Sequence, residues 1–168
     1  MYFLLSLYKI KQHKMNISDI ASQIYAKLLY QPTNNQKKIV EAFAEYLAEG
    51  DSSSIFVLNG YAGTGKTTAV AAVISLLKEY KTKCVLLAPT GRAAKVLSSY
   101  AGQQAYTIHK HIYRQKSVGG DGFGQFSLAP NKDKETLFVV DEVSLIGIDA
   151  GQQQSTASFG SGNLLEDL

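Results

Sequence analysis

Residues 60–67 read Gly-Tyr-Ala-Gly-Thr-Gly-Lys-Thr, which is the complete G-x-x-x-x-G-K-T spacing of a phosphate-binding loop. The apolar run 54–59 precedes the loop, and a helical pattern begins at Lys66. This order of strand, loop and helix predicts a nucleoside triphosphate site at the end of a buried strand. The alternative is a glycine-rich turn that binds nothing, and the order of the three elements argues against it.

The residue types of the loop suit phosphate chemistry. Glycine lets the backbone take φ values that other residues avoid, so several N–H groups can surround an anion. Lys66 brings a positive charge to the β- and γ-phosphates, the Thr67 hydroxyl can bind Mg²⁺, and the start of the helix adds partial positive charge. The nucleotide-binding residues predicted in this segment are Gly60, Ala62, Gly63, Thr64, Gly65, Lys66, Thr67 and Thr68.

An acidic pair at the end of another apolar run completes the predicted site. The run 137–140 is followed directly by Asp141 and Glu142. Asp141 is expected to hold Mg²⁺ together with Thr67, and Glu142 to orient or deprotonate the attacking water. The predicted catalytic residues are therefore Lys66, Asp141 and Glu142. Without the 60–67 loop, such a pair is more often a cap of a strand or helix.

The wider pattern predicts one α/β domain. Three continuous apolar runs have the character of strands buried on both faces of a parallel sheet: 54–59, 83–88 and 136–141. Helical patterns alternate with them: 18–30, a helix from Thr33, 66–80 and 92–100. The alternation indicates a doubly wound parallel sheet with right-handed crossovers and a ligand at the carboxyl ends of its strands.

The division of the chain follows from composition. Residues 1–14 carry three of the 17 lysines and arginines and none of the 14 acidic residues. Their positive charges follow the apolar part, which does not match a signal peptide. A cleaner helical pattern begins after Met15, so we predict that Met15 is the natural start and that 1–14 is an extension. Residues 15–149 form the predicted ATP-binding domain, and 150–168 a flexible loop followed by the start of a truncated helix. Glycine-rich residues 117–131 are expected to be a mobile excursion.

Composition also bears on location. The single cysteine, Cys84, lies in an apolar run and is expected to be a small buried side chain, with no disulfide or metal to form. No stretch is apolar for long enough to cross a bilayer, so no membrane partner is predicted. These features favour a cytoplasmic protein.

The segment 78–116 is locally basic. It contains eight lysines and arginines against one acidic residue, and tyrosines are interleaved with them. Positive charge attracts phosphates and aromatic faces stack on bases, so this segment is a candidate surface for a nucleic-acid strand. A solvated charged face is the alternative.

Four motifs in order resemble the first RecA-like domain of the RecD-like and Dda-like superfamily 1B DNA helicases, a P-loop NTPase domain of the AAA type. They are the loop 60–67, Ala-Pro-Thr-Gly-Arg-Ala-Ala at 88–94, Thr-Ile-His at 107–109, and Asp-Glu-Val-Ser at 141–144. The resemblance implies ATP and Mg²⁺ as cofactors and single-stranded DNA as a partner. The DNA contacts it implies are Pro89, Thr90, Gly91, Arg92, Thr107 and His109.

Two of the implied residues have structural alternatives. Gln36 resembles the glutamine that reads adenine in this family, yet Thr33 and Gln36 also have the spacing of a capping box. His109 could instead be a packed histidine at a strand-to-helix junction. A metal pair of His109 with His111 is rejected, because no further cysteine or histidine lies near them in the sequence.

The resemblance covers about residues 17–149. The later Gly-Asp-x-x-Gln-Leu-Pro-Pro motif and the second RecA-like domain are not in this sequence, so we expect ATP binding with weak hydrolysis and no unwinding by this chain alone. The family would imply movement from 5′ to 3′. A P-loop enzyme of another type, such as a small-molecule kinase, and a non-catalytic nucleotide- or DNA-binding remnant are the alternatives.

Overall fold

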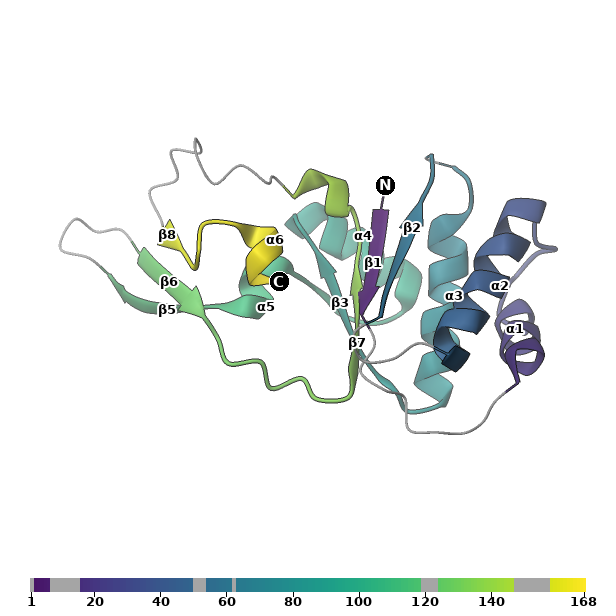
Figure 1. Cartoon of the computed structure of the whole chain (residues 1–168). Helices are drawn as coiled ribbons and strands as arrows, with labels where there is room; N and C mark the ends of the chain where they lie inside the picture. Colours follow the sequence, from purple (N-terminus) through teal and green to yellow (C-terminus); the bar gives the residue numbers. More distant parts are fainter. Residues whose placement is uncertain (1, 7–15, 50–53, 62, 119–123, 147–157) are drawn as a thin grey trace.

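The computed structural model describes residues 2–6, 16–49, 54–61, 63–118, 124–146 and 158–168 (Figure 1). Its larger sheet has five strands in the order β2-β1-β7-β3-β4. Four of these run parallel to one another: β2 (Ile55–Asn59), β3 (Lys83–Ala88), β4 (Ala105–Thr107) and β7 (Thr136–Val140). The predicted mixed α/β fold and the three predicted strands are confirmed. The predicted burial on both faces is wrong for β2, because it lies at the edge of the sheet with Ile55 and Val57 exposed.

The fifth strand, β1 (Tyr2–Ser6), comes from the segment predicted to be an extension. It pairs antiparallel with β2 on one side and with β7 on the other, and Leu4 is opposite both Val57 and Val140. The prediction missed this strand because a short apolar run at a chain start shows no period by which to assign it. That Met15 is the natural start stays a prediction, and residues 7–15 lie outside the described part.

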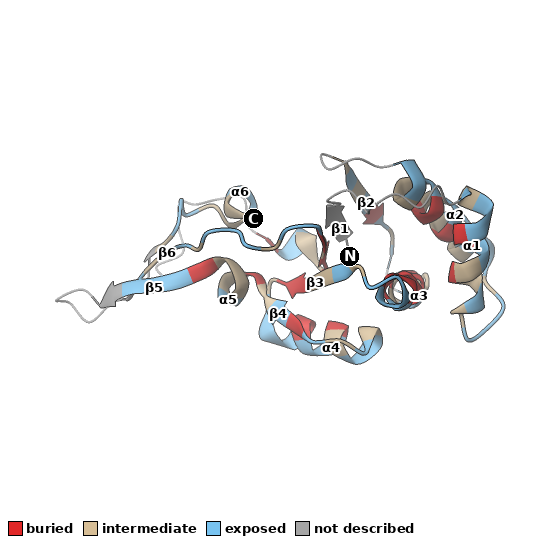
Figure 2. Ribbon diagram, turned by 90° about the horizontal axis from the view of Figure 1, so that it is seen from below, coloured by how far each residue is buried: buried red, intermediate tan, exposed pale blue. Residues whose placement is uncertain are grey.

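One face of the sheet is covered by four helices: α1 (Ile17–Ala26), α2 (Asn34–Glu49), α3 (Lys66–Glu79) and α4 (Gly91–Ala101). The helix α3 is buried along much of its length (Figure 2). Its apolar side chains pack with Leu86 and Val139 of the sheet and with α1 and α2. The Phe43 ring of α2 stacks on Phe56 of β2, with ring centroids 4.4 Å apart. This core holds β2 and α3, the two elements that flank the 60–67 loop.

The opposite face carries a smaller apolar cluster. Leu87 and Val140 point to this face because side chains alternate along a strand. They pack with residues of α5 (Ile108–Ile112), the 3₁₀ turn η1 (Val143–Leu145) and α6 (Leu164–Asp167). A helix start was predicted within 150–168, and the structure has the short helix α6 there. Residues 150–157 of the segment expected to be flexible lie outside the described residues.

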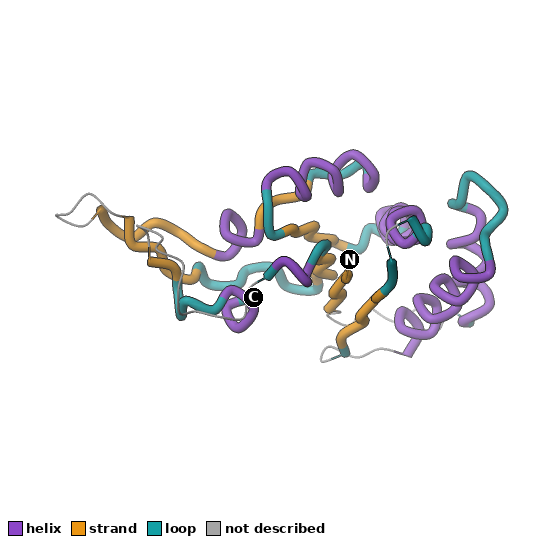
Figure 3. The backbone as a smooth tube through the Cα atoms, turned by 90° about the horizontal axis from the view of Figure 1, so that it is seen from above, coloured by secondary structure: helices purple, strands orange, loops and turns teal. Residues whose placement is uncertain are grey.

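A second sheet extends away from α1 and α2 (Figure 1, Figure 3). Its strands are β5 (Tyr113–Val118), β6 (Gly124–Leu128) and β8 (Ser158–Phe159), in the order β5-β6-β8. Residues 117–131 were predicted to be a mobile loop, and this is wrong for residues 117–118, which end β5, and for residues 124–128, which form β6. Glycines misled the prediction, because they concentrate around the connection between the two strands, of which residues 119–123 are not described.

Among the described residues, no helix has the length and apolar character needed to span a membrane.

Candidate functional site

The 60–67 loop lies between β2, which ends at Asn59, and α3, which begins at Lys66. Gly63 and Gly65 have φ values of 78° and 79°, in the left-handed region where a Cβ is unfavourable. These two positions turn the chain from the strand into the helix. Gly65 is also the N-cap of α3, so the start of this helix points its free N–H groups into the loop. Ala62 lies outside the described residues.

The Lys66 side chain is folded into the loop. It is 3% exposed, and its Nζ donates to the carbonyl oxygens of Gly60 and Tyr61, each 2.5 Å away. It also donates to Thr64 Oγ1 at 3.2 Å. The oxygens of the loop therefore hold a buried positive charge inside it.

Asp141 follows β7 and is 2% exposed. Its backbone N–H donates to the Leu87 carbonyl at 2.9 Å, which continues the pairing of β7 with β3. Burial raises the pKa of Asp141 to about 6, although the hydrogen bond from Glu142 and the charge of Lys66 act in the opposite direction. The carboxylate is thus held in a poorly solvated place under the influence of Lys66, where a cation would stabilise its charge.

Two side chains of the predicted site carry oxygen donors of the kind that Mg²⁺ binds. Thr67 is in the first turn of α3, and Asp141 supplies a buried carboxylate. In the described residues, no group of three or more His, Cys, Asp or Glu side chains could hold a metal ion. Mg²⁺ suits such a site, because it is usually bound through one or two protein oxygens, with water and phosphate oxygens completing its shell.

Glu142 has an unusual backbone. Its φ is 55°, which is left-handed and unfavourable for a residue with a side chain. It precedes η1, and its side chain is partly exposed. Strained backbone of this kind concentrates at functional sites, where the surrounding structure enforces it.

The structure shows Gln36 in the capping-box arrangement. Thr33 N–H donates to Gln36 Oε1 at 3.0 Å, and Gln36 N–H donates to Thr33 Oγ1 at 3.2 Å. Gln36 Nε2 in addition lies 3.5 Å from the carbonyl oxygen of Gly65, in the phosphate loop. The helix-cap alternative is therefore confirmed, and adenine recognition stays a prediction.

The two motifs with implied DNA contacts lie side by side. Ala88, at the end of β3, is the register partner of Thr107, at the end of β4. Each motif begins a helix: Thr90 Oγ1 accepts from Ala93 N–H and Thr107 Oγ1 accepts from Lys110 N–H, both at 3.2 Å. These hydroxyls act as N-caps, which sequence spacing did not reveal. Thr90, Gly91 and Arg92 are exposed, and Pro89 is partly exposed.

His109 is packed among aromatic rings. Its ring centroid is 5.6 Å from that of Tyr113 and 5.1 Å from that of Phe159. Burial lowers the pKa of His109. His109 is therefore a packed histidine at the junction of β4 and α5, which is the structural alternative given for it above.

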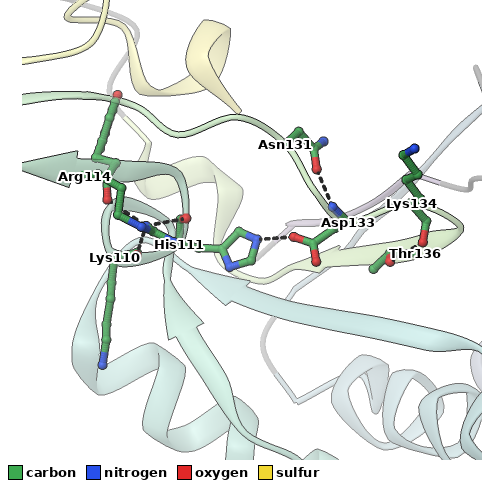
Figure 4. A network of polar contacts seen from close by, with 8 residues as sticks. Lys110, His111, Arg114, Asn131, Asp133, Lys134 and Thr136 are labelled. Atoms are coloured by element: carbon green, nitrogen blue, oxygen red, sulfur yellow. Dashed lines mark hydrogen bonds and ion pairs between the residues drawn. The ribbon is translucent and has the colours of Figure 1, made fainter.

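Sequence reasoning missed a polar network around α5 (Figure 4). The Arg114 guanidinium donates to the carbonyl oxygens of Lys110 and His111 at 3.1 and 3.0 Å, so it caps the end of this helix. His111 Nε2 lies 3.0 Å from Asp133 Oδ2, which ties α5 to the segment before β7. All eight lysines and arginines of the basic segment 78–116 are exposed.

A glycine-rich loop with a buried lysine, followed by its helix, and a buried acid at the end of a parallel strand define a P-loop NTPase domain. The family model described as AAA domain matches residues 31–156, and the chain belongs to this family.

Three relatives show which branch is similar. The ATP-dependent RecD2 DNA helicase of Deinococcus radiodurans is 34% identical over 116 residues, covering 69% of this chain and 15% of the relative. The ATP-dependent DNA helicase dda of Enterobacteria phage T4 is 47% identical over 101 residues, covering 52% and 20%. The multifunctional conjugation protein TraI of Escherichia coli is 28% identical over 146 residues, covering 82% and 7%. The predicted resemblance to the first motor domain of RecD-like helicases is confirmed, and the chain spans a fifth or less of these relatives.

Proposed function

We propose that this chain is the ATP-binding part of the motor of an ATP-dependent DNA helicase. The observation that carries the proposal is that buried Lys66 begins the helix after β2 and the glycine loop, and buried Asp141 directly follows β7, a parallel strand of the same sheet. This is the arrangement that phosphoryl transfer needs, because catalysis there depends on positioning and on neutralising charge.

In the proposed site, backbone N–H groups of residues 60–68 bind the phosphates, and Lys66 contributes its charge to them. Thr67 and Asp141 would hold Mg²⁺, which when bound neutralises charge on the phosphate oxygens. Glu142 orients the attacking water and accepts its proton. The resemblance implies that Gln36 reads adenine, whereas its amide contacts with Thr33 and the Gly65 carbonyl favour a role at the phosphate loop.

The proposed DNA surface is the edge formed by residues 89–92 and 107–109. Exposed Arg92 would contact the phosphate backbone, with Pro89, Thr90 and Gly91 beside it. Thr107 and His109 would shape the neighbouring turn, since Thr107 caps α5 and the His109 ring, within α5, packs against Phe159. Exposed Lys110 and Lys116 extend the positive charge along this side.

This chain spans only 15% and 20% of the two helicase relatives, so translocation and unwinding are proposed for the whole protein and not for this chain. The proposed movement is from 5′ to 3′, and the proposed location is the cytoplasm. Such movement requires parts that close and open around the nucleotide. By itself the chain is proposed to bind MgATP and to hydrolyse it slowly.

The test is a titration of fluorescent single-stranded DNA at two salt concentrations, with and without a non-hydrolysable ATP analogue. Lys66→Ala should abolish analogue binding, and Arg92→Ala should weaken DNA binding and flatten its dependence on salt. Lys38→Ala, an exposed lysine on α2, is the control for charge alone. Unchanged analogue affinity in Lys66→Ala would overturn the phosphate-loop assignment. Analogue binding without any DNA affinity would favour a P-loop enzyme of another type.

A further inference from the structure

The side chain of Gln36 occupies the space beside the last glycine of the phosphate loop. Its Nε2 lies 3.5 Å from the Gly65 carbonyl oxygen, a long hydrogen bond. A Cβ added to Gly65 would lie only 2.5 Å from Nε2 and 2.9 Å from Cδ of Gln36. Position 65 therefore needs glycine for its φ of 79°, and any larger residue there would also displace the Gln36 amide.

The opposite end of the amide fixes its direction. One atom of the Gln36 amide lies 3.0 Å from the Thr33 N–H. Because this N–H is a donor, the atom that accepts from it is the amide oxygen, Oε1. The Gln36 backbone N–H in turn donates to Thr33 Oγ1 at 3.2 Å. With its oxygen committed to the first turn of α2, Gln36 can present only its N–H₂ group to the loop.

The Gly65 carbonyl, which accepts from the Gln36 N–H₂ group, is part of the start of α3. The Gly65 carbonyl also accepts the Ala69 N–H at 3.1 Å, so it begins the hydrogen-bond ladder of α3. The same peptide unit carries the backbone N–H of Lys66, one of the groups that face a bound phosphate. A group that holds the Gly65 carbonyl thus sets the direction of a phosphate-binding N–H.

We infer that Gln36 is a positioning residue for the phosphate loop, joining the start of α2 to the start of α3. It acts on the polyphosphate cradle, and its loss weakens every triphosphate alike, whatever the base. For ligand binding this inference rests on the proposed function, whereas the ordering of the loop is a property of the protein without nucleotide.

The first experiment follows backbone amide hydrogen exchange of residues 60–67 in the nucleotide-free chain. Gln36→Ala removes both amide contacts. Gln36→Glu keeps an acceptor for Thr33 N–H, and so the helix cap, but has no donor for Gly65. Both variants should speed exchange in the loop by about three- to tenfold, the effect of one typical hydrogen bond. Gln31→Ala, an exposed glutamine just before Pro32, is the matched control and should leave exchange unchanged.

The second experiment measures the affinities of wild type and Gln36→Ala for MgATP, MgGTP and magnesium tripolyphosphate. All three affinities should fall by a similar factor of about three to ten. The glutamate variant is left out of this comparison because its charge would repel phosphate directly.

Two results would overturn the inference. One is normal loop exchange in Gln36→Glu, which would assign Gln36 to the helix cap alone. The other is a loss confined to ATP, which would assign it to the base. If wild type binds none of the three ligands, the proposed function fails, and the exchange experiment alone decides the positioning role.

Discussion

The backbone N–H of Glu142 donates a 2.7 Å hydrogen bond to the Asp141 carboxylate, and Glu142 adopts a φ of 55° in the same turn. The buried acid and its neighbour are thereby oriented as one unit. Asp141 remains beneath the site, while the chain reverses so that the Glu142 side chain stays partly exposed. The two acids have different surroundings, and this suits different tasks.

Glu142→Gln should keep ATP-analogue affinity within about twofold of wild type, because the amide has nearly the same shape and Lys66 is untouched. Hydrolysis should fall by about 100-fold or more, the usual effect of losing a general base. Single-turnover hydrolysis and equilibrium analogue binding check the two halves separately. Wild-type turnover in this variant would remove Glu142 from the mechanism.

Glu142→Gly should stabilise the fold by about 1 kcal/mol while hydrolysis is lost, because glycine relieves the left-handed strain. Glu135, with a φ of 52°, offers a matched control, because it lies just before β7, at the opposite end of that strand from the acidic pair. Glu135→Gly should stabilise similarly and leave hydrolysis at its wild-type rate. Urea unfolding measures both free energies, and a destabilised Glu142→Gly chain would contradict the strain argument.

Leu4→Pro should destabilise the chain by about 3 kcal/mol or more, because proline removes a ladder donor from a strand paired on both sides. The effect should concentrate at β2, since β1 is its neighbour in the sheet. Thermal unfolding gives the total loss, and hydrogen exchange of residues 55–59 locates it. If stability and β2 protection both match wild type, residues 2–6 contribute nothing to the fold.

Cys84 should resist alkylation while the chain is folded. Burial raises the pKa of Cys84 from 9.0 to about 11, so at pH 8 its thiolate is about 100-fold scarcer than in the unfolded chain. The folded chain holds the Cys84 proton to higher pH than the unfolded chain does. The stability that this difference contributes is complete below pH 9 and is lost as the pH rises towards 11. Iodoacetamide labelling with and without urea measures the rates. Cys84→Ser should remove this part of the alkaline loss of stability, and equal labelling rates would contradict burial.

Local sequence was sufficient for the parts of the molecule that local physics controls. The spacing of residues 60–67 requires its own left-handed glycines, so the loop and the start of α3 were predictable. Continuous apolar runs located β2, β3 and β7, but they did not show that β2 is an edge strand with one apolar face exposed. Thr33 and Gln36 form a cap over three residues, so that interaction was predictable as well.

Only the tertiary structure decided which distant segments meet. Tyr2–Ser6 became a central strand, and Gln36 came to lie on Gly65, 29 residues away. Ala88 was brought beside Thr107, and His111 was tied to Asp133. Periodicity shows which face of an element is apolar, but it does not select the partner or the register. Those depend on the packing of the whole core, which alone compensates the entropy lost in closing long loops.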